Sequence, residues 1–432
     1  MARSNDFEVI RDPLWNNIRV DREALKLLDT EPLQRLRYIR QLGHAFLVYP
    51  GATHSRFEHA LGTYHLARRT FVLFSERGEL EAIPEEDIVA ARLAALLHDV
   101  GHYPFSHALE EAGLPSHEGL AQRHLQHPEV RAALADTGID DLETKLSNLI
   151  RGCSRSPLQG LIAGSLDLDK IDYLTRDARM CGVPYGTVDV DRLLHSLTVV
   201  TDAHGTQSVG VHEKGLSALE SLLFAKYQMY RNVYWHHAVR SATAMFKRLV
   251  RDAVRQDELD ASLIPNLTDE DLMGMLNNLQ DDRLGRRLRR RQLFKRALDL
   301  PSDHFPAAHD SWISDNPTLV TRVEDRLAAE LRIDPGTILL DYPAKPAMLA
   351  ADLAVLTRHQ GVERLDGEHG QTLLGIQQVA EPLHNRARRF RVFVDDPATT
   401  LLPARAMVRL AESSEAEIEA LLSAERGLLG LG

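Results

Sequence analysis

The sequence predicts a mainly helical protein with a small β-hairpin and a smaller α+β region at its C-terminal end. Apolar residues recur at helical spacing over most of residues 31–300. A segment near residues 197–212 reads as two short strands around a turn that contains glycine. After residue 300 the chain changes to short strand-like segments between turns with proline and glycine. We therefore place an approximate domain boundary near residue 300. It divides a helical core, residues 1–300, from an α+β region, residues 301–432. The second region has a candidate role in oligomerisation.

The first helices are marked by their N-terminal signals. Residues 31–42 have proline at an early helical position and apolar residues at helical spacing. Ser55 is placed to cap a helix that runs to about Glu76, and Glu58 completes a capping box. Residues 84–101 begin in an acidic first turn, and their apolar density predicts a buried helix that stops near a glycine.

The remaining elements follow in order. Helices are expected over residues 166–180, from about 214 to 254, and over 268–300, the last including the basic run RRLRRRQLFKRAL. Strands are expected at Thr337–Leu340 and Arg391–Val394.

Composition limits the classes of function. The net charge of −11 gives no general attraction to nucleic acid, so a polyanionic ligand must be met by local basic residues or a metal. No apolar run approaches the ~18 residues of a membrane span, and the N-terminus lacks an apolar signal-peptide core. The two cysteines, Cys153 and Cys181, do not suggest a disulfide scaffold. These observations favour the cytoplasm and no membrane partner.

Histidines concentrate in the first third of the chain and indicate a metal site. His98 and Asp99 are adjacent at the end of the expected buried helix, and such a pair offers a nitrogen and a hard oxygen to one cation. His59 and Asp169 lie on separate predicted helices. A mixed set of this kind suits Mn²⁺, Fe²⁺, Mg²⁺ or Zn²⁺ and leaves octahedral positions open. Spacing alone does not show that these helices converge.

Six ordered segments resemble the HD-domain phosphohydrolases, and most closely their deoxynucleotide triphosphohydrolase branch. The segments are LQRLRYIRQLG (33–43), YPGATHSRFEHALG (49–62), LAALLHDVGHYPFSHALE (93–110), SHEG (116–119), DLDKIDYLTRDA (167–178) and YRNVYWH (230–236). The resemblance implies an HD-domain helical core in which His59, His98, Asp99 and Asp169 hold a divalent metal. It also implies hydrolysis of a dNTP at the α-phosphorus, which yields a deoxynucleoside and inorganic triphosphate.

The resemblance assigns further roles at the reacting centre. By match to the family, His107 gives a proton to the leaving 5′-oxygen, and His102 and His117 line the α-phosphate. Glu110 stands where the vertebrate relative has aspartate, and a carboxylate there would orient a histidine.

The resemblance also implies residues that bind the substrate. Arg56 lies one helical turn before the expected ligand His59, on the same face, and with Lys170 and Lys226 it would neutralise the triphosphate. Lys226 replaces an arginine and therefore loses the planar fork. The residues expected around the sugar and base are Gln41, Leu42, Tyr173, Asp177 and Tyr234. Tyr173 would pack where a 2′-hydroxyl would protrude, and Asp177 would meet the 3′-hydroxyl.

Relatives of this kind are often activated by a nucleotide bound between subunits. Gln34 and Arg37 match part of a guanine-reading pocket, which makes GTP or dGTP a candidate effector and a homo-oligomer, as a dimer of dimers, the expected assembly. The run Arg286–Arg296 is a candidate holder of effector phosphates or a contact for nucleic acid, although it needs no ligand as a solvated helix.

Two other functions remain open from the sequence. One is an HD phosphodiesterase or phosphatase for another nucleotide, and the Tyr173, Asp177 and Gln41 pattern argues against it. The other is a non-catalytic nucleotide sensor, and the complete set of metal ligands argues against it.

Overall fold

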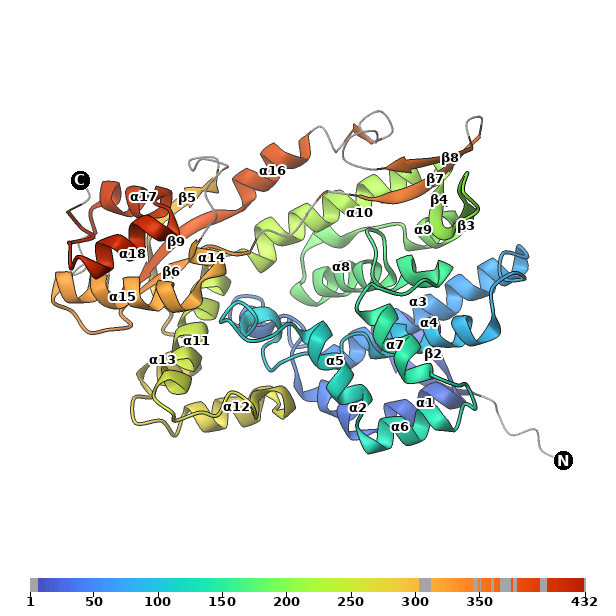
Figure 1. Ribbon diagram of the computed structural model, residues 1–432, viewed down its shortest axis with the longest axis horizontal. Helices are drawn as coiled ribbons and strands as arrows, with labels where there is room; N and C mark the ends of the chain where they lie inside the picture. The colour runs from blue at the N-terminus through green and yellow to red at the C-terminus, as the bar shows by residue number, and fades with distance from the viewer. Residues whose placement is uncertain are drawn as a thin grey trace.

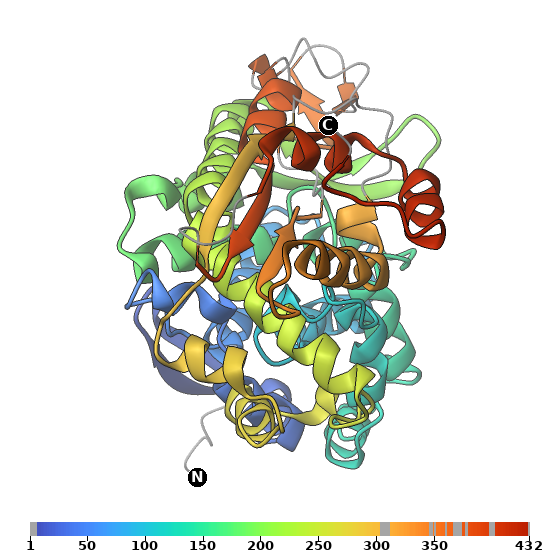
Figure 2. The same cartoon turned by 90° about the vertical axis from the view of Figure 1, so that its left-hand side faces the viewer.

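The protein consists of a large helical core and a smaller C-terminal lobe, seen in a computed structural model that describes residues 7–302, 312–344, 349, 351–358, 361–365, 374–375, 379–396 and 402–430. In Figure 1 the core runs from blue to green, and most of the orange and red elements of the lobe gather at the left, whereas the orange strands within residues 353–365 lie at the upper right. Figure 2 shows these elements in front of the core. The predicted mainly helical fold with a hairpin and an α+β C-terminal region is confirmed.

The core is a stack of helices around one continuous apolar cluster. Its helices are α1 (Arg22–Leu28), α2 (Glu31–Arg35), α3 (Arg56–Glu76), α4 (Glu85–Leu97), α5 (His117–Leu125), α6 (Pro128–Ala135), α7 (Leu142–Ile150), α8 (Leu168–Cys181), α9 (Val190–Ser196) and α10 (Leu216–Met229). The capping box of Ser55 and Glu58 begins α3 as expected. Helix α4 is buried along its last five residues, so the residue that follows it has a fixed position.

The C-terminal lobe packs on a long helix that leaves the core. The helices of this part are α11 (His237–Arg255), α12 (Asp269–Leu276), α13 (Arg283–Arg289), α14 (Trp312–Asp315), α15 (Pro317–Leu331), α16 (Ala380–Ala387), α17 (Ala404–Glu412) and α18 (Glu415–Ser423). A second and a third apolar cluster lie around α11 and around α15.

Strands among the described residues form three small sheets. The strands are β1 (Phe7–Asp12), β2 (Asn16–Asp21), β3 (Leu197–Thr201), β4 (Gln207–His212), β5 (Lys295–Pro301), β6 (Ile338–Asp341), β7 (Leu353–Thr357), β8 (Gly361–Leu365) and β9 (Arg389–Val394). Strands β1 and β2 form one hairpin, and β3 and β4 form the expected hairpin, which β7 and β8 extend to the order β3-β4-β7-β8. The lobe is built on the order β5-β9-β6.

The helix expected over residues 31–42 is wrong in its second half. Helix α2 ends at Arg35, one 3₁₀ turn follows, and Ile39 is extended with φ −118° and ψ 115°. The backbone N–H of Arg56 donates to the carbonyl of Ile39, and Arg40 forms an antiparallel bridge with Ser55. Long-range pairing with the segment before α3 therefore overrides the local helical spacing.

The single helix expected from about residue 214 to 254 is also wrong, because it is interrupted. Helix α10 ends at Met229 and is followed by a π-helix, Tyr230–Tyr234, in which the N–H of Trp235 donates to the carbonyl of Tyr230. His236 is then extended, with ψ 132°, and caps α11. One-turn π-helices of this kind occur often at functional sites.

The continuous helix expected over residues 268–300 is the third correction. The segment contains α12, α13 and then β5, and Arg291 between them has a positive φ of 54°. The basic run is therefore divided between a short helix and a strand. Strand β5 pairs antiparallel with β9, so the boundary we placed near residue 300 falls inside a strand of the C-terminal sheet.

Candidate metal centre

Four side chains converge on one point between α3, α4 and α8. His59 lies on α3, His98 and Asp99 follow the last turn of α4, and Asp169 lies in the first turn of α8. The Nε2 atom of His59 is 3.2 Å from Nε2 of His98 and 2.9 Å from Oδ1 of Asp169. Carboxylate oxygens of Asp99 lie 3.6 Å and 3.4 Å from the same two nitrogens. The structure thus brings the four predicted metal ligands together.

The ring of His59 is held from behind by a buried carboxylate. Its Nδ1 atom is 2.8 Å from Oδ2 of Asp172, and it donates because a carboxylate only accepts. Asp172 also accepts from Nε of Arg176 at 2.9 Å and from the indole N–H of Trp15 at 2.5 Å. A Cβ at Gly62 would lie 1.9 Å from Asp172, so a glycine is required there for α3 to approach α8. Such outer partners fix the tautomer of a metal-binding histidine.

His98 is oriented in the same way by its own helix. Its Nδ1 atom is 3.0 Å from the carbonyl oxygen of Ala95. A carbonyl oxygen only accepts a hydrogen bond, so Nδ1 carries the hydrogen and Nε2 presents a lone pair to the cluster. Two such nitrogens that face each other at 3.2 Å repel unless a cation or a proton lies between them.

The ionised carboxylates of the cluster are stabilised by an added positive charge. Burial alone would lower the pKa of His59, but hydrogen bonds with Asp169 and Asp172 outweigh it and raise the pKa to about 10. Burial would raise the pKa of Asp99, but nearby cationic groups, Arg56 first, hold it well below its usual range. The carboxylates therefore stay ionised and draw a proton onto an imidazole. A bound divalent cation satisfies the same demand.

The spacing of the donor atoms fits one divalent metal ion. Two ligands at right angles, each about 2.1 Å from one cation, are about 3.0 Å apart. The distances from His59 Nε2 and His98 Nε2 to each other and to the carboxylate oxygens run from 2.9 to 3.6 Å. Two nitrogens with two carboxylates suit manganese, iron, zinc or magnesium and do not choose among them.

A second group of histidines adjoins this centre. Glu110 accepts from Nδ1 of His107 at 2.8 Å and from Nδ1 of His117 at 2.5 Å. The ring of His102 stacks on that of His117, with centroids 3.7 Å apart, and its Nε2 is 3.3 Å from Asp99 Oδ1. The four residues that we predicted around the reacting centre therefore lie together, and Asp99 joins them to the metal cluster.

The members of this second group differ in exposure and charge. The side chain of His107 is 60% exposed, whereas that of His117 is 13% exposed. Burial would lower the pKa of His117, but Glu110 raises it, and burial together with Arg56 lowers the pKa of His102. Glu110, despite its longer side chain, reaches both partners. The group has one accessible histidine, at its outer end.

The aromatic residues expected at the sugar lie beside the metal cluster. The ring centroid of Tyr173 is 6.5 Å from that of His59 and 6.5 Å from that of Tyr234. The hydroxyl of Tyr234 donates to Asp177 at 2.7 Å, and the other oxygen of Asp177 is 2.8 Å from Nε2 of His54. Asp177 is thus fixed from two sides next to Tyr173.

Gln41 and Leu42 lie on the turn that follows the extended segment. The backbone N–H of Gln41 donates to the carbonyl of His54 at 3.0 Å, so this turn adjoins the partner of Asp177. The side-chain oxygen of Gln41 is buried without a hydrogen-bond partner among the described residues. Leu42 is half-buried against the core.

The cationic residues expected at the phosphates already have partners. A terminal N–H of Arg56 donates to Asp99 at 2.5 Å, inside the protein. Lys170 donates to Asp167 at 2.5 Å. Burial and the neighbouring Lys170 lower the pKa of Lys226 to about 8.

The residues expected at an effector site form a small surface cluster. Nε of Arg37 donates to the side-chain oxygen of Gln34 at 2.8 Å, and its guanidinium lies 3.6 Å from the ring centroid of Phe57. The amide of Gln34 donates to the carbonyl of Leu28 at 2.7 Å.

Two residues of the centre were missed by the sequence reasoning. Asp172 lies one turn after Asp169 on the same helix, and that spacing was a usable signal. His54 precedes α3 and contacts Asp177 across 123 positions of the chain, so no local pattern points to it.

Comparison with known proteins agrees with the fold and the site. Residues 56–177 match the HD domain, and residues 188–371 match the HD associated region. The first range contains all four residues of the metal cluster. The fold and the site therefore define an HD-domain protein of the metal-dependent phosphohydrolase class.

This chain belongs to the HD-domain phosphohydrolase family. It is 35% identical over 362 residues to an uncharacterized protein of Methanocaldococcus jannaschii, a match covering 83% of this chain and 74% of that protein. It is 29% identical to the deoxynucleoside triphosphate triphosphohydrolase SAMHD1 of Bos taurus, over 53% of this chain and only 45% of that protein. A hypothetical protein from Aquifex aeolicus has a similar structure, with a TM-score of 0.71 and 28% identity, over 94% of this chain and 99% of that one.

Within the part of the chain that the structure describes, no helix combines the length and the apolar character needed to cross a membrane.

Proposed function

We propose that the protein hydrolyses deoxynucleoside triphosphates to a deoxynucleoside and inorganic triphosphate. The observation that carries the proposal is the position of the Tyr173, Tyr234 and Asp177 group directly beside the metal cluster. A sugar bound there would have its 5′ end at the cluster. The similarity to SAMHD1 proteins, named as deoxynucleoside triphosphate triphosphohydrolases, supports the same substrate class.

The metal ligands are His59, His98, Asp99 and Asp169 in this proposal. A divalent cation, when bound, lowers the pKa of a coordinated water and polarises a phosphoryl oxygen. Asp172 and the carbonyl of Ala95 keep both imidazole Nε2 atoms directed at it.

Proton delivery is the role that we propose for the second histidine group. The leaving 5′-oxygen is a poor leaving group and needs a proton in the transition state. Glu110 holds Nδ1 of His107, so the exposed Nε2 is the atom that gives the proton. His102 and His117, stacked beside it, line the phosphate. Glu110 acts as a positioning residue for two rings at once.

Selection of the sugar rests on the neighbours of Asp177. With one oxygen bound to Tyr234 and the other to His54, the carboxylate is fixed to accept from a 3′-hydroxyl. The Tyr173 ring closes the space where a 2′-hydroxyl would lie. Gln41, with a buried oxygen that has no partner among the described residues, and Leu42 would contact the sugar and base.

Neutralising the triphosphate requires the buried cations to change partners. We propose that Arg56, Lys170 and Lys226 serve this purpose. Lys170 would exchange Asp167 for a phosphate oxygen. The lowered pKa of Lys226 would return towards its usual value when an anion binds beside it.

Regulation and assembly form the remaining part of the proposal. We propose GTP or dGTP as an effector at Gln34 and Arg37, in a homo-oligomer built with the help of residues 301–432, and a cytoplasmic location.

Product identification tests the proposal. Metal-loaded protein is incubated with each dNTP, each NTP and a cyclic dinucleotide, with and without GTP, and the products are separated by chromatography. We expect deoxynucleoside and triphosphate from dNTPs only. Tyr173→Phe, which keeps the ring, is the matched control and should retain the preference, whereas Tyr173→Ala should admit NTPs. Release of monophosphate, or cleavage of the cyclic dinucleotide, would replace the proposal with a phosphatase or phosphodiesterase.

A further inference from the structure

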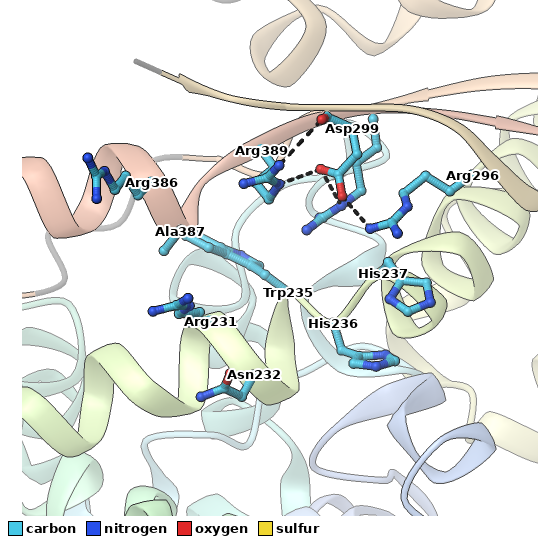
Figure 3. Close-up of a pocket in the computed structure, with 11 residues that line it drawn as sticks. Arg231, Asn232, Trp235, His236, His237, Arg296, Asp299, Arg386, Ala387 and Arg389 are labelled. Atoms are coloured by element: carbon cyan, nitrogen blue, oxygen red, sulfur yellow. Dashed lines mark hydrogen bonds and ion pairs between the residues drawn. The ribbon is translucent and has the colours of Figure 1, made fainter. Parts of the chain in front are cut away.

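Remote segments of the chain also meet outside the metal cluster. They meet at a basic cavity between the π-helix, the start of α11 and strands β5 and β9, where Figure 3 shows Asp299 beside Arg389. The end of the run Arg286–Arg296 lines that cavity, which therefore belongs with the effector role expected of this run. Remote segments meet again at the loop just before His107, and the contacts of this loop point to a role in catalysis.

Two consecutive residues of this loop have a backbone conformation that side chains disfavour. Phe105 has a φ of 56° and a ψ of 22°, and Ser106 has a φ of 60°. A bulky residue such as phenylalanine is seldom found in this left-handed region. Such strain persists only where the surrounding structure holds it, and it is common at active sites. The strained pair lies directly before His107, the residue proposed to deliver the proton.

The surrounding structure holds Phe105 through both its backbone and its ring. The backbone N–H donates to Oδ1 of Asp269, the first residue of α12, at 2.7 Å. The ring stacks on that of His44, with centroids 4.4 Å apart and planes 7° apart, and packs against Phe246. Asp269 also accepts from the backbone N–H of Arg40 at 3.1 Å. The loop and the segment that contains Arg40 are therefore fixed to the same carboxylate.

The hydroxyl of Ser106 joins separate parts of the candidate site. Its Oγ atom lies 2.8 Å from the carbonyl oxygen of Arg40 and 3.0 Å from that of Gln41, and it donates to this pair of carbonyls. It accepts from Nε of Arg56 at 3.0 Å, and a terminal N–H of Arg56 donates to Asp99 of the metal cluster. Ser106 is 4% exposed, so these bonds form away from bulk water. One hydroxyl thus links the metal cluster, the turn expected to contact the sugar and base, and the loop that carries the proton donor.

We propose that Ser106 is a positioning residue for proton transfer to the leaving oxygen. Because the His107 side chain is 60% exposed, its position depends on the backbone that carries it, and Ser106 fixes that backbone. This role rests on the proposed function. In that reaction a water oxygen bonds to the α-phosphorus, and the bond from phosphorus to the 5′-oxygen breaks. The 5′-oxygen takes a proton from His107, which a proton from the water restores.

Turnover of two substrates by the metal-loaded full chain tests this role. Ser106→Ala removes the hydroxyl and should lower kcat for a dNTP by about tenfold to a hundredfold, a part of what a positioned acid supplies. The second substrate is a dNTP analogue with sulfur in place of the bridging 5′-oxygen. Its thiolate leaves without a proton, so on this analogue Ser106→Ala should stay within about twofold of the wild type. A merely structural role predicts an equal loss on both substrates, and that result would overturn the proposal.

Ser106→Gly separates the hydroxyl from the backbone strain. Glycine adopts a positive φ without steric cost, so this variant should melt no lower than Ser106→Ala and carries the test if that variant does not fold. It lacks the hydroxyl, so its kcat for a dNTP should be at least as low as that of Ser106→Ala. Both variants should keep their metal, because Arg56 retains its bond with Asp99. Wild-type activity in Ser106→Gly, or loss of metal in either variant, would refute the positioning role.

Ser196→Ala is the matched control. Ser196 is 1% exposed, and its hydroxyl donates to the carbonyl of Leu193 at 2.7 Å, so the variant loses the same kind of buried bond and should keep both rates. Failure of the proposed function gives a different result, because the wild type itself would then release no deoxynucleoside from a dNTP. Alkyl and p-nitrophenyl esters of the phosphate that the wild type does hydrolyse would then replace the two substrates. A loss confined to the alkyl ester supports the role of Ser106, and an equal loss on both esters overturns it.

Discussion

Two buried clusters of charged side chains in this protein differ in whether their own positive and negative charges balance. In the first, the metal cluster, His59 and His98 meet Asp99 and Asp169, and Arg56 is the nearest permanent cation. In the second, Arg240 and Lys247 on α11 meet Glu111 and Asp341. Arg240 donates two hydrogen bonds to each carboxylate, and Lys247 contacts both.

This difference in charge balance distinguishes a candidate metal site from an ion-pair cluster that only stabilises the fold. We call the second cluster, Arg240, Lys247, Glu111 and Asp341, the structural joint. The cluster around Arg240 contains two acids and two bases, so it is neutral by itself and ties α11 and β6 to the core. The metal cluster has two carboxylates and two lone-pair nitrogens directed at one point, and it is balanced only when a further cation is added. We therefore expect removal of the metal to change the metal cluster and to leave the ion pairs of Arg240 and Lys247 intact.

Loss of a metal ligand should have the largest effect. His98→Ala removes one of the two nitrogens, so the bound metal and turnover should disappear together, with activity reduced by more than about a thousandfold. The metal content of the purified variant, measured by elemental analysis, should fall from about one ion per chain to a small fraction. The Lys247–Glu111 joint is untouched, so cooperative unfolding of the metal-free protein should be retained. A variant that keeps its metal and its activity would contradict the ligand assignment.

Glu110→Gln should reduce activity by about a hundredfold to a thousandfold while metal stays bound. The amide cannot hold His107 and His117 as a carboxylate does. Because Glu110 raises the pKa of His117, that pKa should fall in the variant, and the alkaline limb of the rate profile, where the protonated histidine is lost, should move to lower pH. Elemental analysis is the control. If the variant lost its metal together with its activity, Glu110 would be a metal ligand and not a positioning residue.

Asp172→Asn should weaken metal affinity by about ten- to a hundredfold without abolishing it. The amide keeps the shape but no longer strengthens the basicity of His59, and competition with a chelator measures the change. Asp167→Asn is the acidic control at the N-cap of the same helix, where asparagine can still cap, and it should change metal affinity less. An equal loss of metal affinity in both variants would show that the negative charge of this region, and not the hydrogen bond between Asp172 and His59, sets the affinity.

Asp341→Asn should destabilise the fold by about 3 kcal/mol at pH 7 and leave metal content unchanged. Burial would raise the pKa of Asp341, but Arg240 and Lys247 outweigh it and lower the pKa. Its stabilising effect is therefore complete above the unfolded pKa of about 3.9 and is lost as pH falls through the lower folded value. Urea unfolding at several pH values should show wild type and variant converging below about pH 4. A constant difference across that range would refute this account of the joint.

Local signals predicted the elements whose causes are local. The capping box at Ser55 and the β3–β4 hairpin both depend on neighbouring residues, and both are confirmed. Ile39 is extended because its carbonyl accepts from the N–H of Arg56, 17 positions along the chain. The spacing of apolar residues gives no sign of this long-range pairing. The π-helix after Met229 is likewise invisible in a helical pattern, since both turn types accept the same residues.

The candidate site divides in the same way. Adjacent His98 and Asp99 indicated a metal from residue chemistry, but their meeting with Asp169 was inferred from resemblance, because packing of distant helices decides it. The contact of His54 with Asp177 and the bonds of Ser106 with Arg56 and Gln41 both join remote segments and became visible only in three dimensions.

The central claim is that four side chains hold one divalent cation. Crystals of the manganese-loaded protein, measured with X-rays at which manganese scatters anomalously, test it directly. We expect one strong anomalous peak bonded to His59, His98, Asp99 and Asp169 at about 2.1–2.3 Å. No peak among these residues, or a peak held only by His102, His107, Glu110 and His117, would contradict it.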